Sequence, residues 1–282
     1  MIEQFQHKAT NSFMLWFDNY LLKKGQAYSN QTGKFYYYSD DRLDDRFKAF
    51  GSPYKQWVND SSISGAAIPS GVYISGNFQP RSSSLLLDFT NGRSLISGVS
   101  STAPVSGSFA VKDFNIYFTN DGEEDLIVDK KYTPNSRIFS AQASYVEPYD
   151  NVVPAIFLSS QSINNAPFSF GGEDTTKIQM KAVVMAENSY QLDGALSIFA
   201  DSLNEVFPSI PFSGNPTTEY GDVKNGFYSY DSLKNQYNGE PLFFIEEVVT
   251  SKLSDKARKS LSNDLFIGFI DFEIHQQRFP RA

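Results

Sequence analysis

The last stretch of the chain carries the pattern that most constrains its fold. Within residues 264–275, apolar side chains recur at every second position and polar ones fill the positions between: Phe266, Ile270, Phe272 and Ile274 against Asp271, Glu273 and His275. A period of two is typical of a β-strand with one buried face. A chain that ends in its most apolar strand needs an earlier sheet to receive it. We therefore predict that this strand pairs with strands at 242–253 and 177–186, beneath a helix at 191–207.

Composition places the chain among globular proteins rich in β-structure. Hydrophobic residues make up 40% and charged residues 20% of the 282 residues, which is enough apolar material for a packed core. Aromatic residues reach 15%, a level that favours strands and protein–protein surfaces. The length allows two domains or one large all-β domain.

Several classes of function are disfavoured by what the sequence lacks. It has no cysteine, which excludes thiol catalysis, disulfides and thiolate zinc sites. His7 and His275 are its only histidines, and its net charge of -8 comes without a lysine and arginine block that could bind nucleic-acid phosphates. Phosphate-loop, nucleophile-elbow and zinc-protease motifs are also missing. We expect no cofactor, no metal and no enzymatic activity, with a carboxylate-based hydrolase as the remaining enzymatic alternative.

The termini and the longest apolar runs bear on localisation. The first eight residues are polar and lack a signal-peptide pattern, and no apolar run approaches 18 residues. We expect a soluble protein, made in a reducing cytosol, that does not enter a membrane.

The chain divides into four parts of an α+β, β-rich fold. Residues 1–63 are predicted to hold an N-terminal helix and an aromatic segment, and residues 64–160 a small β-sandwich or barrel-like domain. Residues 161–176 are polar and glycine-containing and are predicted as a linker. Residues 177–282 are predicted as an α+β domain with a mainly antiparallel sheet and one long helix.

Two hairpins are predicted in the second part. Asn91-Gly92 divides the run 84–97 into two strand-like halves, which predicts a two-residue type I′ turn. A second hairpin is predicted over 108–128, turning at 120–122.

The N-terminal helix, over residues 1–24, has an unusually aromatic stripe and stops at Gly25. Such a stripe suits either a core helix, which is the favoured interpretation, or a docking arm for a neighbour. As interface residues on this helix we name Phe13, Trp16 and Phe17.

Two acidic stretches and one histidine are candidate sites. Asp121, Glu123, Glu124 and Asp125 lack the ligand order of a calcium loop, so a solvated hairpin tip is predicted. Asp121, Glu123 and Asp125 at this tip are the other predicted interface residues. Residues 39–46 contain two Asp-Asp pairs, each followed by an arginine, and a solvent-facing helical turn is predicted there. His275, beside Asp271 and Glu273, is interpreted as part of a solvated sheet edge or a subunit contact.

Scattered stretches carry a resemblance to a known class of proteins. They are Phe35-Tyr36-Tyr37-Tyr38, residues 51–58, 70–74, 88–93 and 109–117, Leu192-Asp193-Gly194 and residues 269–274. Together they resemble virion structural proteins of contractile-tailed bacteriophages, of the kind found in marine and cyanobacterial relatives of the T4 group. None of these stretches is a catalytic signature, so the resemblance implies no enzymatic residues.

The resemblance implies a non-enzymatic structural subunit of the virion, made in the host cytoplasm. It would form a homo-oligomeric ring at the neck, the head–tail junction or the upper tail, in contact with other virion proteins. An acidic ring would also suit a channel through which DNA slides without binding. A baseplate or collar component is the alternative within the class, and a carbohydrate-binding β-sandwich module is the alternative outside it.

Overall fold

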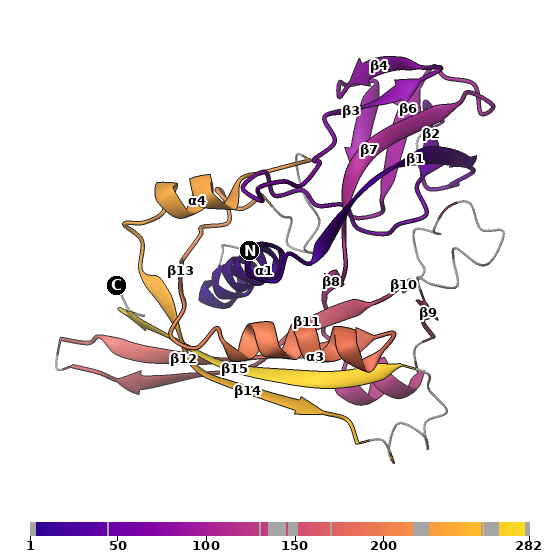
Figure 1. The fold of residues 1–282 in the computed structure, drawn as a ribbon. Helices are drawn as coiled ribbons and strands as arrows, with labels where there is room; N and C mark the ends of the chain where they lie inside the picture. The colour runs from indigo at the N-terminus through magenta and orange to yellow at the C-terminus, as the bar shows by residue number, and fades with distance from the viewer. Residues whose placement is uncertain are drawn as a thin grey trace.

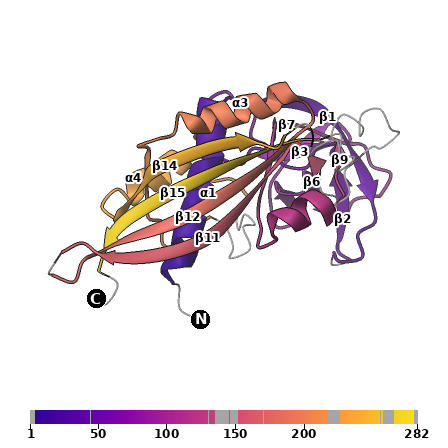
Figure 2. The ribbon, with the colours of Figure 1, turned by 90° about the horizontal axis from the view of Figure 1, so that it is seen from below.

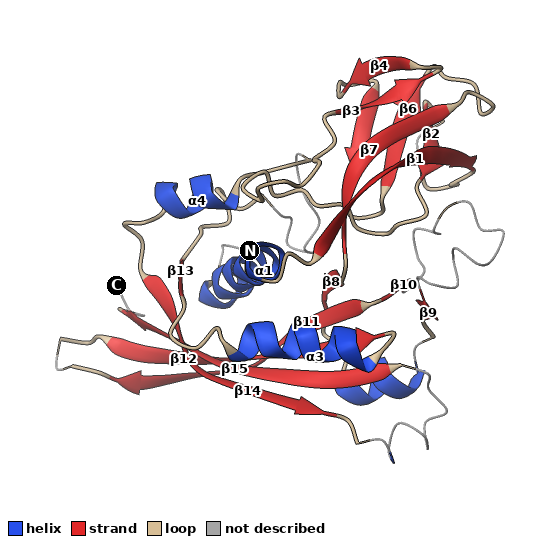
Figure 3. Ribbon diagram, viewed as in Figure 1, coloured by secondary structure: helices blue, strands red, loops and turns tan. Residues whose placement is uncertain are grey.

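Two sheets and a long helix between them organise the protein. The computed structural model describes residues 4–43, 45–129, 131–134, 145, 152–169, 171–216, 226–254, 256 and 265–279. One sheet is antiparallel and nearly closed like a barrel, and the other is a mixed half-barrel with helices on its inner side (Figures 1 and 3). The predicted class, α+β and β-rich with an N-terminal helix, is confirmed.

The first sheet has seven strands in the order β4-β3-β7-β1-β2-β6-β5. They are β1 (Tyr28–Tyr38), β2 (Phe47–Gly51), β3 (Gly71–Ile74), β4 (Asn77–Pro80), β5 (Leu85–Asp88), β6 (Arg93–Ser97) and β7 (Val105–Lys112). Aromatic side chains fill its interior, where Trp57 stacks on both Phe35 and Phe109 with ring centroids 5.3 and 4.8 Å away. Trp57 is therefore a core residue of this sheet.

The second sheet has six strands in the order β13-β14-β15-β12-β11-β8. They are β8 (Asn115–Phe118), β11 (Ala155–Pro167), β12 (Asp174–Ala186), β13 (Val206–Pro208), β14 (Leu242–Lys252) and β15 (Phe266–Arg278). The closing strand β15 pairs with β12 on one side and β14 on the other, and α3 (Ser189–Ala200) packs on all three strands. The predicted partners of the closing strand are thus confirmed.

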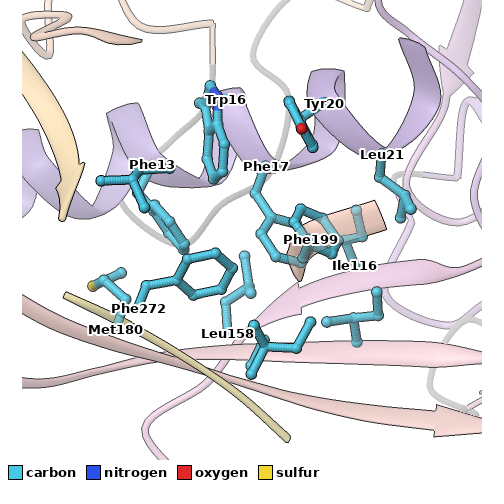
Figure 4. Packing of buried hydrophobic residues seen from close by; sticks show 14 of the residues in the cluster. Phe13, Trp16, Phe17, Tyr20, Leu21, Ile116, Leu158, Met180, Phe199 and Phe272 are labelled. Carbon is cyan, nitrogen blue, oxygen red and sulfur yellow. The ribbon is translucent and has the colours of Figure 1, made fainter. Parts of the chain in front are cut away.

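The helix α1 (Phe5–Lys24) fills the concave inner side of the second sheet (Figure 2). Figure 4 shows its aromatic side chains pointing at Phe199 of α3 and Phe272 of β15. Phe13, Trp16 and Phe17 are only 1%, 4% and 0% exposed. Their assignment as interface residues is therefore wrong, because the half-barrel uses this stripe as its own core and leaves none of it for a neighbour.

The remaining elements are short. They are the π-helical turn η1 (Asp125–Asp129), the strand pair β9 (Thr133–Pro134) and β10 (Val152–Val153), and α4 (Tyr230–Gln236), which lies beside α1.

The segment 161–176, predicted as a linker, belongs instead to the β11–β12 hairpin, whose β12 strand also pairs with β15 as far as Asp174 opposite Arg278. β11 and β12 pair from Ala155 opposite Met185 to Pro167 opposite Asp174. The outer half of β11 is exposed along nearly its whole length, so its serine and asparagine residues show no apolar alternation. Backbone pairing needs no such alternation, which is why the sequence pattern missed these strands.

The predicted domain boundaries at 64 and 160 also differ from the structure. The first sheet already begins at Tyr28, and after β7 the chain passes into the second sheet, where β8 pairs in parallel with Ala155–Leu158. The hairpin predicted over 108–128 is therefore wrong, because β7 and β8 belong to different sheets. Its predicted return strand forms the helical turn η1.

The Asn-Gly hairpin exists, but its turn is not the predicted one. Asp88 pairs with Arg93, so the loop holds four residues, and within it only Gly92 has a positive φ, +59°. The Phe89 side chain is buried and its carbonyl accepts the Trp57 N–H at 2.9 Å, which draws the chain out of the ladder.

The helix predicted over 191–207 is shorter than expected. It ends at Ala200, and Val206–Pro208 forms the edge strand β13 against β14.

Candidate functional site

The outer face of the second sheet gathers most of the polar side chains singled out in the closing strand. Alternate residues of β12 point inward to the core, such as Met180, while Lys177 and Lys181 point outward. The register places Lys181 opposite Asp271 and Lys177 opposite His275. The face is therefore a lattice of charged and amide side chains over the three neighbouring strands β12, β15 and β14.

His275 lies in the middle of this face. Because β15 has a partner strand on both sides, its placement at a sheet edge is wrong. Its ring stacks on Phe244 at 5.2 Å with a 12° angle between the planes, and its Nδ1 lies 3.3 Å from the Glu246 carboxylate. The stack on Phe244 therefore orients the ring, and a carboxylate lies near its Nδ1.

Two lysines neutralise most of the acids around them. Lys177 Nζ is 3.0 Å from Glu246 and also contacts Glu273, and Lys181 contacts Glu123 and lies 3.5 Å from Asp271. The hydrogen bond from Lys177 lowers the pKa of Glu246, despite an opposing effect of burial. Glu246 is therefore held in its ionised form.

An open groove of about 320 Å³ runs over this face. It is lined by Gln161, Gln179, Met180, Lys181, Glu247, Val249, Asp271, Phe272 and Glu273. Glu247 and Glu273 are direct cross-strand neighbours, which brings two carboxyl groups into the range that a hydrolase would need. The Glu273 carboxylate, however, is already in contact with the Lys177 ammonium and belongs to an ion pair. The arrangement suits a hydrated ion-pair lattice better than acid–base catalysis.

The acidic run at 121–125 begins a helical turn and is not a hairpin tip. Asp121 accepts a hydrogen bond from the Thr119 hydroxyl at 2.9 Å, and an Asp125 carboxylate oxygen accepts one from the Gly122 N–H at 3.4 Å. Acids at a helix start are favoured by its exposed N–H groups and dipole. Of the predicted interface residues, Glu123 forms an ion pair with Lys181, while Asp121 and Asp125 are exposed.

The Asp-rich stretch at 39–46 supplies one partner of a buried arginine that the sequence patterns did not single out. Arg93 Nη1 donates to Asp40 at 2.6 Å and to the Tyr38 hydroxyl at 2.9 Å, and its Nε donates to Asp88 at 2.8 Å. Burial raises the pKa of Tyr38 to about 12. The expected helical turn neutralised by Arg42 and Arg46 is wrong, because the described part of this stretch is a turn between β1 and β2.

A second buried polar cluster joins α1 to the first sheet. Asp60 is fully buried and accepts hydrogen bonds from Asn19 Nδ2 at 2.7 Å, the Ser62 hydroxyl at 2.7 Å and the Tyr230 N–H at 3.0 Å. Beside it, Lys112 of β7 donates to Asp18 of α1 at 2.6 Å. Residues far apart in the chain thus lock the first sheet to the helix, and no local sequence pattern signals this.

Neither a protein-family model nor a curated protein matches this sequence. In the part of the chain that the structure describes, no set of three or more histidine and acidic side chains is grouped to hold a metal ion. None of the described helices has the length and apolar character needed to cross a membrane.

Proposed function

We propose that this chain is a non-enzymatic structural subunit of a tailed-phage virion. It forms a homo-oligomeric ring at the neck, the head–tail junction or the upper tail, and it contacts other virion proteins there. The resemblance of its aromatic and glycine-containing stretches to such proteins supports this function, and so does one structural observation.

That observation is the arm formed by β11 and β12, which extends beyond the helices that cover the rest of the sheet (Figure 1). Most of the Gln161–Pro167 half of β11 is exposed, and the loop that joins the two strands carries Phe168 with 57% of its side chain exposed. An ordered edge strand whose outer half buries few of its side chains within its own chain is expected to gain stabilisation from a neighbour.

The outer sheet face agrees with a structural role. Its acids are mostly paired with lysines, and in an assembled ring their excess negative charge would repel DNA phosphates if this face lined the channel. A ring in which this face points away from the lumen would remove the channel part of the proposal and leave the ring itself.

Imaging tests the function directly. We expect the purified chain, alone or with its particle, to appear as a closed ring in electron micrographs and to have a multiple of its 31.7 kDa monomer mass in solution. The position along the particle of an antibody bound to this chain, or of the density assigned to it, separates a neck or upper-tail location from a baseplate or collar location. A chain that stays monomeric and is missing from virions would overturn the proposal.

A carbohydrate-binding module is the second candidate, favoured by exposed aromatic side chains on the first sheet. Tyr36 and Tyr37 are 41% and 40% exposed, and Tyr73 and Phe78 form an exposed pair with ring centroids 5.4 Å apart. Rings of this kind can stack on sugars, whereas the buried Trp57 cannot. Saturable glycan binding that is lost in a Tyr73→Ala, Phe78→Ala variant would favour this function over the structural one.

A further inference from the structure

The open edge of β11 presents a defined row of unpaired backbone groups. The Phe168 N–H donates to the Glu173 carbonyl at 2.9 Å, which makes this a hydrogen-bonded pair, so the neighbouring pair of Pro167 with Asp174 exchanges no hydrogen bonds. The two kinds of pair alternate along an antiparallel ladder, so Asn165 and Ile163 belong to the same kind as Pro167. Their N–H and C=O groups therefore point away from β12, to the side where β8 stops at Leu158.

The open edge of β14, on the other side of the same sheet, presents a matching row. The Leu253 N–H bonds to the Ile267 carbonyl at 2.9 Å, which makes this a hydrogen-bonded pair. Alternation then places Lys252, Thr250 and Val248 in non-bonded pairs with β15. Their backbone groups point outward, past β13 and the residues before it, whose backbone hydrogen bonds to β14 reach as far as Ile245 among the described residues.

Neither row has a backbone partner among the described residues. No strand of the described chain lies beyond residues 161–167 of β11 or residues 246–252 of β14. The β11 stretch contains no charged residue, so it lacks the lysines that usually protect an open edge from pairing.

The two rows fit one another in direction and in face. β11 and β14 run antiparallel within the sheet, so a copy continuing that sheet would place its β14 antiparallel to β11. The side chains of the residues in both rows also lie on the inner face of the sheet, since Ile163 lies opposite the core residue Ile178 and Thr250 lies opposite the core residue Ile270. Hydrogen-bonded pairing of the two rows therefore keeps the inner and outer faces continuous from one copy to the next.

We propose that copies of this chain assemble edge to edge, with β11 of one copy adding antiparallel to β14 of the next. Full overlap of the rows pairs Ile163 with Lys252 and Asn165 with Thr250, and it places Pro167, which can only accept through its C=O, beside Val248. The two edges are different surfaces, so the contact is heterologous and generates a ring when the rotation closes. This deepens the proposed ring function and rests on it, because both require self-association.

The free part of β11 lies near the tip of the arm, and the free part of β14 lies toward the opposite end of the sheet. In the register, Ile163 aligns with Ile245 across the sheet, whereas the free row of β14 centres on Thr250. Neighbouring copies are therefore staggered along the strands, as strands are in a closed barrel.

Cysteine cross-linking tests this pairing on a chain that has no cysteine of its own. In the proposed register Asn164 faces Ser251 in a non-hydrogen-bonded pair, the geometry in which Cα atoms are about 4.5 Å apart and a disulfide can form. We expect a mixture of Asn164→Cys and Ser251→Cys proteins to form a disulfide-linked dimer, and neither protein alone to do so. Self-linking of Asn164→Cys would overturn the proposal, because it would show a symmetric β11–β11 contact.

Proline variants test the hydrogen bonds themselves. Asn165→Pro and Thr250→Pro each remove an outward N–H that the single chain does not use, so the variants should fold with an unchanged circular dichroism spectrum. We expect each to weaken self-association about tenfold or more, measured by mass photometry across a dilution series. The matched Asn165→Ala and Thr250→Ala variants keep the N–H and should assemble like the wild type.

The outcomes separate this pairing from the ring function. Wild-type rings that survive both proline variants, with no mixed cross-link, would overturn the β11–β14 pairing and leave the ring proposal standing. A wild-type chain that remains monomeric at every concentration and on the particle would overturn both.

Discussion

The rings of Phe17 and Phe199 stack in the inner core, with centroids 4.0 Å apart and planes 14° apart. This contact joins α1 to α3, and the edge of each ring meets Phe272 of β15 (Figure 4). A helix from the start of the chain, a helix from its second half and its last strand thus share one aromatic cluster. The N-terminal helix belongs to the fold itself and is not an appendage.

Replacing Phe17 is therefore expected to destabilise the second sheet and the helices packed on it. Phe17→Ala removes a fully buried ring and leaves a cavity, which should lower the free energy of unfolding by about 3–5 kcal/mol. Urea unfolding followed by tryptophan fluorescence measures this loss. Tyr190→Ala, at a position 87% exposed on α3, is the control and should change stability by less than about 0.5 kcal/mol.

Arg93 is expected to be the most sensitive charged residue of the first sheet. Arg93→Ala leaves Asp40 without its arginine partner inside the protein and also releases Asp88 and the Tyr38 hydroxyl. Breaking a buried ion pair from one side should cost about 3–5 kcal/mol of unfolding free energy. The exposed Lys34→Ala variant on β1 serves as the control. Equal stability of the two variants would contradict the role given to Arg93.

Acid should weaken the Asp40–Arg93 contact in a defined pH range. Burial alone would raise the pKa of Asp40, but hydrogen bonds from Arg93 and from the Arg42 N–H outweigh it and lower this pKa below the ordinary 3.8. A carboxyl with a depressed folded-state pKa contributes stability above its unfolded pKa, and this contribution is lost as pH falls through the folded one.

We therefore expect the stability advantage of the wild type over Asp40→Asn to shrink on acidification below about pH 4. Urea midpoints at a series of pH values from neutral to acid measure it. An advantage that grows on acidification would show that the sign is wrong.

Gly92 should tolerate no side chain, for two separable reasons. Its φ is +59°, and a Cβ built there would lie 1.9 Å from the Tyr54 carbonyl oxygen. Gly76 shares the positive φ, +82°, but a Cβ there meets nothing within 4 Å.

Gly76→Ala should therefore lower the free energy of unfolding only by the cost of placing a side chain at positive φ, about 1–2 kcal/mol. Gly92→Ala should lower it by at least about 2 kcal/mol more, because the 53–55 segment must also move. Thermal melts of the two variants give the comparison directly. Similar melting temperatures for both would mean that the Tyr54 segment yields without cost.

Patterns with a strong local period predicted their elements well. The alternation at 264–275 predicted a half-buried strand, and the length and apolar character of its neighbours correctly identified β12 and β14 as its partners. The aromatic stripe at the N-terminus predicted α1 and, in its favoured interpretation, a core helix.

Errors arose where backbone pairing or distant partners decide the structure. The outer half of β11 is held by main-chain pairing with β12 while most of its side chains face water, so its composition alone resembled a linker. The turn after β5 is longer than predicted because the Phe89 side chain is buried and its carbonyl accepts the Trp57 N–H. Trp57 lies more than 30 residues before Asn91-Gly92, so the local sequence does not indicate this contact.

In the candidate sites, too, local periodicity predicted some features and distant contacts decided the others. The sequence placed Asp271, Glu273 and His275 on one polar face, since alternation alone decides which side chains share a face. Only the tertiary structure placed that face in the middle of a sheet, brought Lys177 and Lys181 to its acids, and carried Arg93 to Asp40 across 53 residues of chain. The physical reason is that periodicity depends on neighbours along the chain. Ion pairs and strand order depend instead on which distant segments the closing strand and the aromatic helix bring together.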